Sequence, residues 1–138
     1  MAITDTVQAP FDDDHLMQLL DAKLVEGRAG HVVIEYTVRD TIVQRHGTCH
    51  GTCHGGVLFS LADAACGIAA NAGGESAVTQ HSAIQFMQPA PVGAVLHTTA
   101  TTRSSAGRTR VYDVSVTDAR GQAVAEVRCH ARCIDSPT

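Results

Sequence analysis

The spacing of apolar residues changes along this chain from a helical pattern to a strand-like alternation. Near the N-terminus this change predicts a helix followed by a hairpin. Apolar residues at Leu16, Met17, Leu19 and Leu20 follow three aspartates, which predicts a short helix over about 12–21. From 22 to 40 apolar and polar residues then alternate around glycines, which predicts a β-hairpin.

The segment 57–71 predicts one long helix. It contains no proline, is rich in alanine and ends before Gly73 and Gly74, which favour a helix C-terminus. Apolar residues lie almost all the way round it, so we expect this helix to be buried. Residues 41–53 before it keep no sustained period and predict a loop.

Alternation returns after Gly74 and continues to the C-terminal region. It predicts four strands, joined as a meander, of which the last three span 95–103, 108–117 and 123–134. One buried helix between a hairpin and a meander predicts an α+β fold in which a curved antiparallel sheet wraps the helix, as in a hotdog fold. We expect a single domain over 1–138, with its core at about 22–134.

Composition and charge limit the classes of partner and the cellular location that we expect. The 138 residues carry a net charge of −4 and one lysine, Lys23, which disfavours nucleic acid and anionic membranes as partners. The chain lacks an 18-residue apolar run, and its N-terminus is acidic where a signal peptide is basic. We therefore expect a cytoplasmic protein.

Five cysteines are an odd number and do not resemble a secreted disulfide framework. Cys129 and Cys133 lie four positions apart on one predicted strand, roughly 13 Å at about 3.3 Å per residue, too far for a disulfide. We expect both to be reduced core residues.

Asp63 is the most informative candidate for chemistry. It is the only Asp, Glu, Lys or Arg between His46 and Gly74, and it lies in the middle of the predicted helix. Burying a carboxylate is costly unless it is paired, solvated or protonated, so catalysis is one reason to keep it. A structural role, facing solvent or bonding to nearby backbone, is the alternative.

Gly55 lies where this helix begins, so its N–H is a donor without an intrahelical acceptor and could bind an oxyanion. Eight residues of helix separate Gly55 from Asp63, roughly 12 Å at about 1.5 Å per residue. Both groups of one chain therefore cannot hold one carbonyl. We expect a site shared between two antiparallel copies of the helix, with Gly55 from one and Asp63 from the other.

The run from His54 to Ala65, HGGVLFSLADAA, with Asn71 and Gly73 after it, resembles the signature of the PaaI-type hotdog thioesterases of phenylacetate degradation. The run IQFMQPA at 84–90 with Gly93, and Gly107 with VYDV at 111–114, resemble later motifs of that family. Together these motifs cover 46–134.

This resemblance implies hydrolysis of an acyl-coenzyme A thioester, without metal or cofactor, by a dimer of dimers. Asp63 would be the general base or the nucleophile, and both routes stay open. The Gly55 N–H would bind the thioester oxygen, with Gly56 beside it and His54 ordering the helix start. Thr79 falls where some relatives carry a hydroxyl that helps to position water. The expected substrate is phenylacetyl-CoA or a hydroxylated relative.

Three arginines bracket the predicted turn at 104–107. Arg103, Arg108 and Arg110 could place a guanidinium near a phosphate of coenzyme A, or could simply be solvated residues of a hairpin.

One position departs from the family pattern: many relatives have Asn six residues before the histidine, and here Thr48 stands there. It lies in a tandem repeat, GTCHGTCH at 47–54, whose histidines and cysteines superficially resemble a metal site. Its glycines disfavour the helix that would align three histidines, so we predict no metal.

Two other functions stay open: a hotdog enoyl-CoA hydratase, and a non-catalytic sensor that binds acyl-CoA or a metal.

Overall fold

The computed structural model describes residues 2–45 and 51–134. The N-terminal region forms two helices, α1 (Asp5–Asp12) and α2 (His15–Leu19), so the prediction of one helix over 12–21 is wrong in its bounds. The break falls at the aspartates because the Asp14 carboxylate caps α2 and accepts a hydrogen bond from Met17 N at 3.1 Å. Val7 and Phe11 anchor α1 in the core.

The predicted hairpin is confirmed as β1 (Lys23–Arg28) and β2 (His31–Thr37), which pair antiparallel. Gly30 has a φ of 76° in the turn between them, a conformation that favours glycine. A side chain at Gly27 would collide with Val7, so this glycine lets α1 pack closely on β1.

The predicted loop at 41–53 contains short regular elements. A 3₁₀ turn (Asp40–Ile42) leads into β3 (Val43–Gln44), which pairs with β4 (Thr52–Cys53). Two-residue strands leave no period in a sequence, so alternation could not reveal them. The long helix α3 (Gly55–Asn71) follows, and it begins two residues before the predicted start.

The remaining strands are β5 (Ser76–Phe86), β6 (Val95–Ala106), β7 (Thr109–Thr117) and β8 (Ala123–Ile134). The sheet order is β1-β2-β6-β7-β8-β5, and each strand pairs antiparallel with its neighbours. The predicted meander therefore holds for β6 to β8 but is wrong for β5. That strand pairs with β8 at the far edge, because β6 pairs with β2 and β7.

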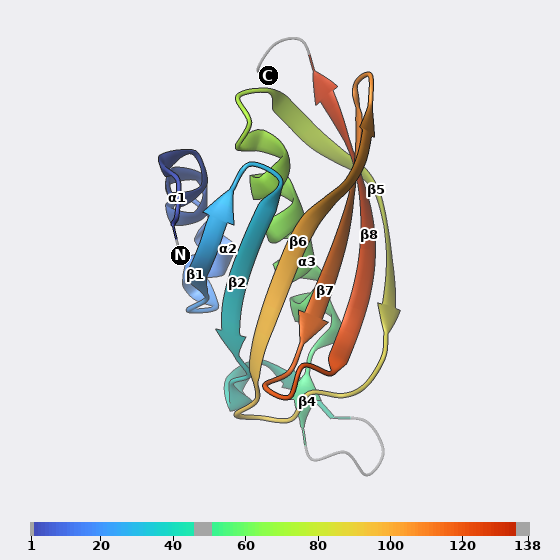
Figure 1. Ribbon diagram of the computed structural model, residues 1–138. Helices are drawn as coiled ribbons and strands as arrows, with labels where there is room; N and C mark the ends of the chain where they lie inside the picture. The colour runs from blue at the N-terminus through green and yellow to red at the C-terminus, as the bar shows by residue number, and fades with distance from the viewer. Residues whose placement is uncertain (1, 46–50, 135–138) are drawn as a thin grey trace.

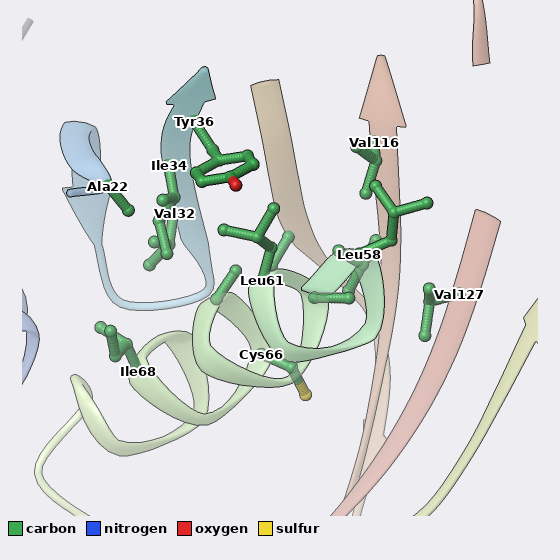
Figure 2. Packing of buried hydrophobic residues seen from close by; sticks show 14 of the residues in the cluster. Ala22, Val32, Ile34, Tyr36, Leu58, Leu61, Cys66, Ile68, Val116 and Val127 are labelled. Carbon is green, nitrogen blue, oxygen red and sulfur yellow. The ribbon is translucent and has the colours of Figure 1, made fainter. Parts of the chain in front are cut away.

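The sheet wraps α3, and the core lies between them (Figure 1). Figure 2 shows Leu58, Leu61 and Ile68 of α3 pointing toward apolar side chains of the sheet. The fold is the expected α+β hotdog fold. The expectation that α3 is buried all round holds only for the face against the sheet. In the single chain, Phe59 and Asp63 on the opposite face are exposed.

The cysteines that the structure describes are free and buried. Cys129 and Cys133 lie on the helix-facing side of β8, as the alternation predicted, while Glu126 and Arg128 face away. Within residues 2–45 and 51–134, no helix is long and apolar enough to cross a membrane.

Candidate active site

The first turn of α3 is fixed by His54. Its Nδ1 accepts a hydrogen bond from Gly56 N at 2.9 Å, and its carbonyl oxygen accepts from Val57 N and Leu58 N at 2.9 and 3.2 Å. The Gly55 N–H alone in this turn has no acceptor among the described residues. His54 therefore orders the helix start and leaves one oriented donor available for a ligand.

Gly55 borders a hollow of about 540 Å³ at the base of the sheet, whose other walls include Leu58, Phe86 and Met87. A Cβ on Gly55 would lie 3.1 Å from Phe86 Cε1, so only glycine fits without moving that ring. Gly56 differs from Gly55 because its N–H is already bonded to His54.

Asp63 lies two turns further along α3 and borders a different hollow, which we call the α3–β5 hollow. Its volume is about 510 Å³, and it is lined by one face of α3 and one segment of β5: Phe59, Asp63 and Gly67, with residues 78–82. The structure thus brings Thr79 to the same hollow as Asp63. Asp63 and Gly55 of one chain lie in separate hollows.

The surroundings of Asp63 disfavour its charge. Although the side chain is exposed in the single chain, neighbouring atoms remove part of the solvent around its carboxyl, which raises the pKa above the ordinary value, and the negative charge of Asp14 raises it further. Asp14 and Asp63 together border a second hollow, of about 320 Å³, between the N-terminal helices and α3. No lysine or arginine of the described part of the chain lines either of the two hollows at Asp63. A carboxylate of raised proton affinity without a cationic partner is suited to accept a proton.

The three candidate arginines lie at the opposite end of α3 from Gly55, around the β6–β7 turn (Figure 1). Arg103 lies 3.6 Å from the Asp113 carboxylate, and Arg110 donates to Glu75 Oε1 at 3.0 Å. The Arg108 carbonyl oxygen accepts from Cys133 N at 2.7 Å. None of the three arginines lines the α3–β5 hollow, so within one chain they do not lie at the same site as Asp63.

Thr48 and most of the GTCH repeat, including Cys49 and His50, lie outside the described residues, as does His46. Among the described residues, no group of three or more His, Cys, Asp or Glu side chains is arranged to hold a metal ion.

Two residues of the site were missed by sequence reasoning. The sequence places Asp14 only at a helix start, because nothing in its spacing relates it to Asp63. Ser82 lines the α3–β5 hollow beside Thr79, although strict alternation would place residues 79 and 82 on opposite faces of a strand.

The family model of the thioesterase superfamily matches residues 50–125. The chain is also 32% identical over 120 residues to the acyl-coenzyme A thioesterase PaaI of Escherichia coli, an alignment that covers 87% of this chain and 83% of that protein. The chain belongs to the PaaI-type hotdog thioesterases. It is therefore a thioester hydrolase.

Solved structures agree with this membership. The E. coli PaaI protein of the phenylacetic acid degradation operon superposes with a TM-score of 0.87 at 29% identity, covering 98% of each chain. A Streptococcus mutans protein bound to acetyl-CoA superposes with a TM-score of 0.76 at 26% identity, covering 85% of this chain and 91% of that one.

Proposed function

We propose that this thioesterase hydrolyses acyl-CoA thioesters with an aryl-acyl group, such as phenylacetyl-CoA or a hydroxylated relative, to the free acid and coenzyme A. The observation that carries the proposal is the position of Asp63, a carboxylate of raised pKa in a hollow that Phe59 also lines. An aromatic wall beside the reacting carboxylate favours a planar acyl group. Similarity to the E. coli acyl-coenzyme A thioesterase PaaI and to the Streptococcus mutans protein bound to acetyl-CoA supports coenzyme A as the thiol portion of the substrate.

In the proposed site Asp63 drives the chemistry. As a general base it would take a proton from water while the water oxygen attacks the thioester carbon. As a nucleophile it would attack the carbon itself, giving a mixed anhydride that water then hydrolyses. In both routes the C–S bond breaks: in the general-base route the proton taken by Asp63 passes to the coenzyme A sulfur, and in the nucleophile route the sulfur leaves as a thiolate that takes a proton from solvent. The Gly55 N–H would bind the oxyanion that develops on the carbonyl oxygen.

We further propose that each site is completed by a second copy of the chain. Gly55 and Asp63 of one chain border separate hollows, and the face of α3 that carries Asp63 is open. An antiparallel arrangement of two α3 helices would bring Asp63 toward Gly55 of the partner subunit. It would also place the arginines of the β6–β7 turn of the chain that supplies Asp63 at the same end as Gly55 of the partner subunit, where they could bind the phosphates of coenzyme A.

The test is a panel of aryl- and alkyl-CoA thioesters, with thiol release followed by a thiol-detecting reagent and Asp63→Asn as the control. We expect the highest kcat/KM with phenylacetyl-CoA or its hydroxylated relatives. Higher kcat/KM with straight-chain substrates would contradict the aryl assignment, and absence of thiol release with every substrate would contradict the proposed function.

A single turnover in H₂¹⁸O with excess enzyme separates the two routes. The general-base route places ¹⁸O in the released acid in the first turnover. The nucleophile route places it in the Asp63 carboxylate when water attacks the Asp63 carbonyl carbon of the anhydride, so label that mass spectrometry finds in the Asp63 peptide establishes the nucleophile route.

A further inference from the structure

Two histidines face each other across β5 and β8, on the side of the sheet away from α3. His81 of β5 lies directly opposite His130 of β8, and the centres of their rings are 5.3 Å apart, with an angle of 49° between the ring planes. Along β8, His130 alternates with Cys129 and Ala131, which are fully buried toward the helix. The two imidazoles therefore lie side by side on the outer face of the sheet.

An irregularity in β5 creates this pair. The register of β5 against β8 shifts between Thr79 and His81, so Gln80 is an extra residue without a partner on β8. Without the shift, Gln80 would lie opposite His130, and His81 would point toward the helix. The bulge therefore brings a second imidazole to the position beside His130.

The ring nitrogens of both histidines are available to a ligand. Neither imidazole has a hydrogen bond to a described residue, and His81 is exposed while His130 is half-buried. His31, elsewhere in the sheet, differs because its Nε2 lies 2.9 Å from Glu26 Oε2 and its Nδ1 lies 3.4 Å from Thr101 Oγ1. A neutral imidazole is the commonest metal ligand in proteins, so the free pair on β5 and β8 is a candidate metal site.

The separation of the two rings fits a single metal ion. In a tetrahedral site with a zinc–nitrogen distance of about 2.1 Å, the centres of two imidazole rings lie roughly 5 Å apart. The observed separation of 5.3 Å agrees with this value. Imidazole suits zinc, copper and nickel, whereas magnesium and calcium take oxygen ligands. The pair therefore suits a transition metal such as zinc, with water in the remaining coordination positions.

Charge around the pair limits its affinity for a cation. Arg128 and Arg132 flank His130 on the same face of β8. The Asp113 carboxylate accepts a hydrogen bond from Arg128 Nε at 2.8 Å and offsets that charge, whereas Arg132 is exposed. A remaining positive charge and only two protein ligands predict micromolar rather than nanomolar affinity. Dialysis against a chelator would therefore leave this site empty.

We propose that His81 and His130 form a zinc site that takes up Zn²⁺ from solution and links the edge strand β5 to β8. His81 also borders the α3–β5 hollow, so the ion would lie next to Asp63 without taking part in hydrolysis. The inference does not rest on the proposed function, which uses neither histidine. The two ligands meet only when β5 pairs with β8, so zinc binds the folded chain in preference to the unfolded one and stabilises it.

The experiment titrates Zn²⁺ into the full chain and its variants by calorimetry and measures the melting temperature with and without the ion. The variants are His81→Ala, His130→Ala, the double variant and the matched control His97→Ala. His97 lies on β6 opposite Glu35 and Thr117, so it has no second histidine across from it. We expect either single variant of the pair to weaken zinc binding by about tenfold or more, and His97→Ala to leave it unchanged.

Zinc should raise the melting temperature of the parent and of His97→Ala but not of the double variant, and Mg²⁺ should raise none of them. Arg132→Gln, which removes the flanking charge, should tighten zinc binding. The melting transition without zinc shows that each variant is folded, and glutamine at 81 and 130 provides a second pair of variants if the alanine proteins are not. A double variant that binds as many zinc ions as the parent, or a parent that binds none at micromolar concentration, overturns the proposal.

Discussion

Asp14 and Asp63 border one hollow, although the first caps α2 and the second lies in the middle of α3. The Asp14 carboxylate is held in place by its hydrogen bond from Met17 N. Its charge adds to burial in raising the pKa of Asp63. The N-terminal helices thus contribute to the electrostatics of the site as well as to the core.

Removing the Asp14 charge should shift the pH dependence of hydrolysis. Asp14→Asn keeps a side-chain oxygen that can cap α2 but lowers the pKa of Asp63 toward its ordinary value. In the proposed mechanism the charged form of Asp63 is the active one, so the acid limb of kcat/KM should move to lower pH. Asp13→Asn removes a neighbouring exposed charge and serves as the control.

The other titratable groups near Asp63 are the thiols of Cys66 and Cys129, and His81, which lines the same hollow. Hydrogen bonding with Cys129 and burial raise the pKa of the Cys66 thiol, so it stays neutral where the acid limb is measured. Equal shifts of the acid limb in Asp14→Asn and Asp13→Asn would show that the net charge of the protein determines the pH at which kcat/KM falls, rather than the closeness of Asp14 to Asp63.

Asp63→Asn should remove activity without unfolding the protein. The amide keeps size and shape but can act neither as base nor as nucleophile, so kcat should fall by about 10²–10⁴-fold. Affinity for a non-hydrolysable acyl-CoA, measured by calorimetry, should persist. Turnover within about threefold of the parent would contradict a catalytic role.

The stability of Asp63→Asn should depend on pH in a defined direction. Since the pKa of Asp63 is raised in the folded state, the folded parent binds more protons than the unfolded chain between about pH 3.9 and the raised value. Stability of the parent therefore falls as pH rises through that window. Urea denaturation should find Asp63→Asn as stable as the parent or more stable at pH 7, with any gain lost below about pH 3.9.

His54 should stabilise α3 through its cap. His54→Ala removes the acceptor for Gly56 N and should cost about 0.5–2 kcal/mol in the free energy of unfolding. His54→Asn supplies a capping oxygen and should recover most of that loss in urea denaturation. If both variants lose the same stability, packing of the imidazole rather than the cap is the important contribution.

Association should involve the open face of α3 and the edge strand β5. Phe59 is 38% exposed on that face, so Phe59→Asp should weaken association in sedimentation velocity and lower kcat together. Leu19→Asp, at a 72% exposed apolar residue of α2, is the matched control and should change neither. A parent chain that is monomeric at micromolar concentration would contradict the shared site.

Co-expression tests the shared site directly. Chains with Asp63→Asn and chains with Gly55→Val should each be inactive as homo-oligomers. A mixed dimer contains one site in which both residues are intact, so activity should return in part. No recovery in a mixed oligomer that is confirmed by mass would contradict a site shared between two subunits.

Chelation should leave the rate unchanged. We predict that the active enzyme holds no metal, because the proposed chemistry needs only a carboxylate and an oriented N–H. Dialysis against a chelator, with elemental analysis before and after, checks this. Near one zinc per chain together with activity lost on chelation would instead favour a metal role for the GTCH repeat.

The sequence by itself determined the elements that local pattern specifies. Alternation predicted the β1–β2 hairpin and the face of β8 that carries Cys129, because side-chain direction in a strand depends only on position. The isolated charge of Asp63 in an apolar helix, the glycine at the helix start and the family motifs together predicted a thioesterase site. These signals are short in range, and they need no knowledge of which strands are neighbours.

Tertiary structure alone decided which residues meet. The place of β5 beyond β8, the shift in its register that turns Ser82 toward α3, and the approach of Asp14 to Asp63 all depend on contacts between distant segments. A bulge reverses the alternation after it, and only pairing with β8 reveals where it occurs. The open face of α3 is likewise a property of the packed chain, since the sheet covers one side of an apolar helix and leaves Asp63 on the other.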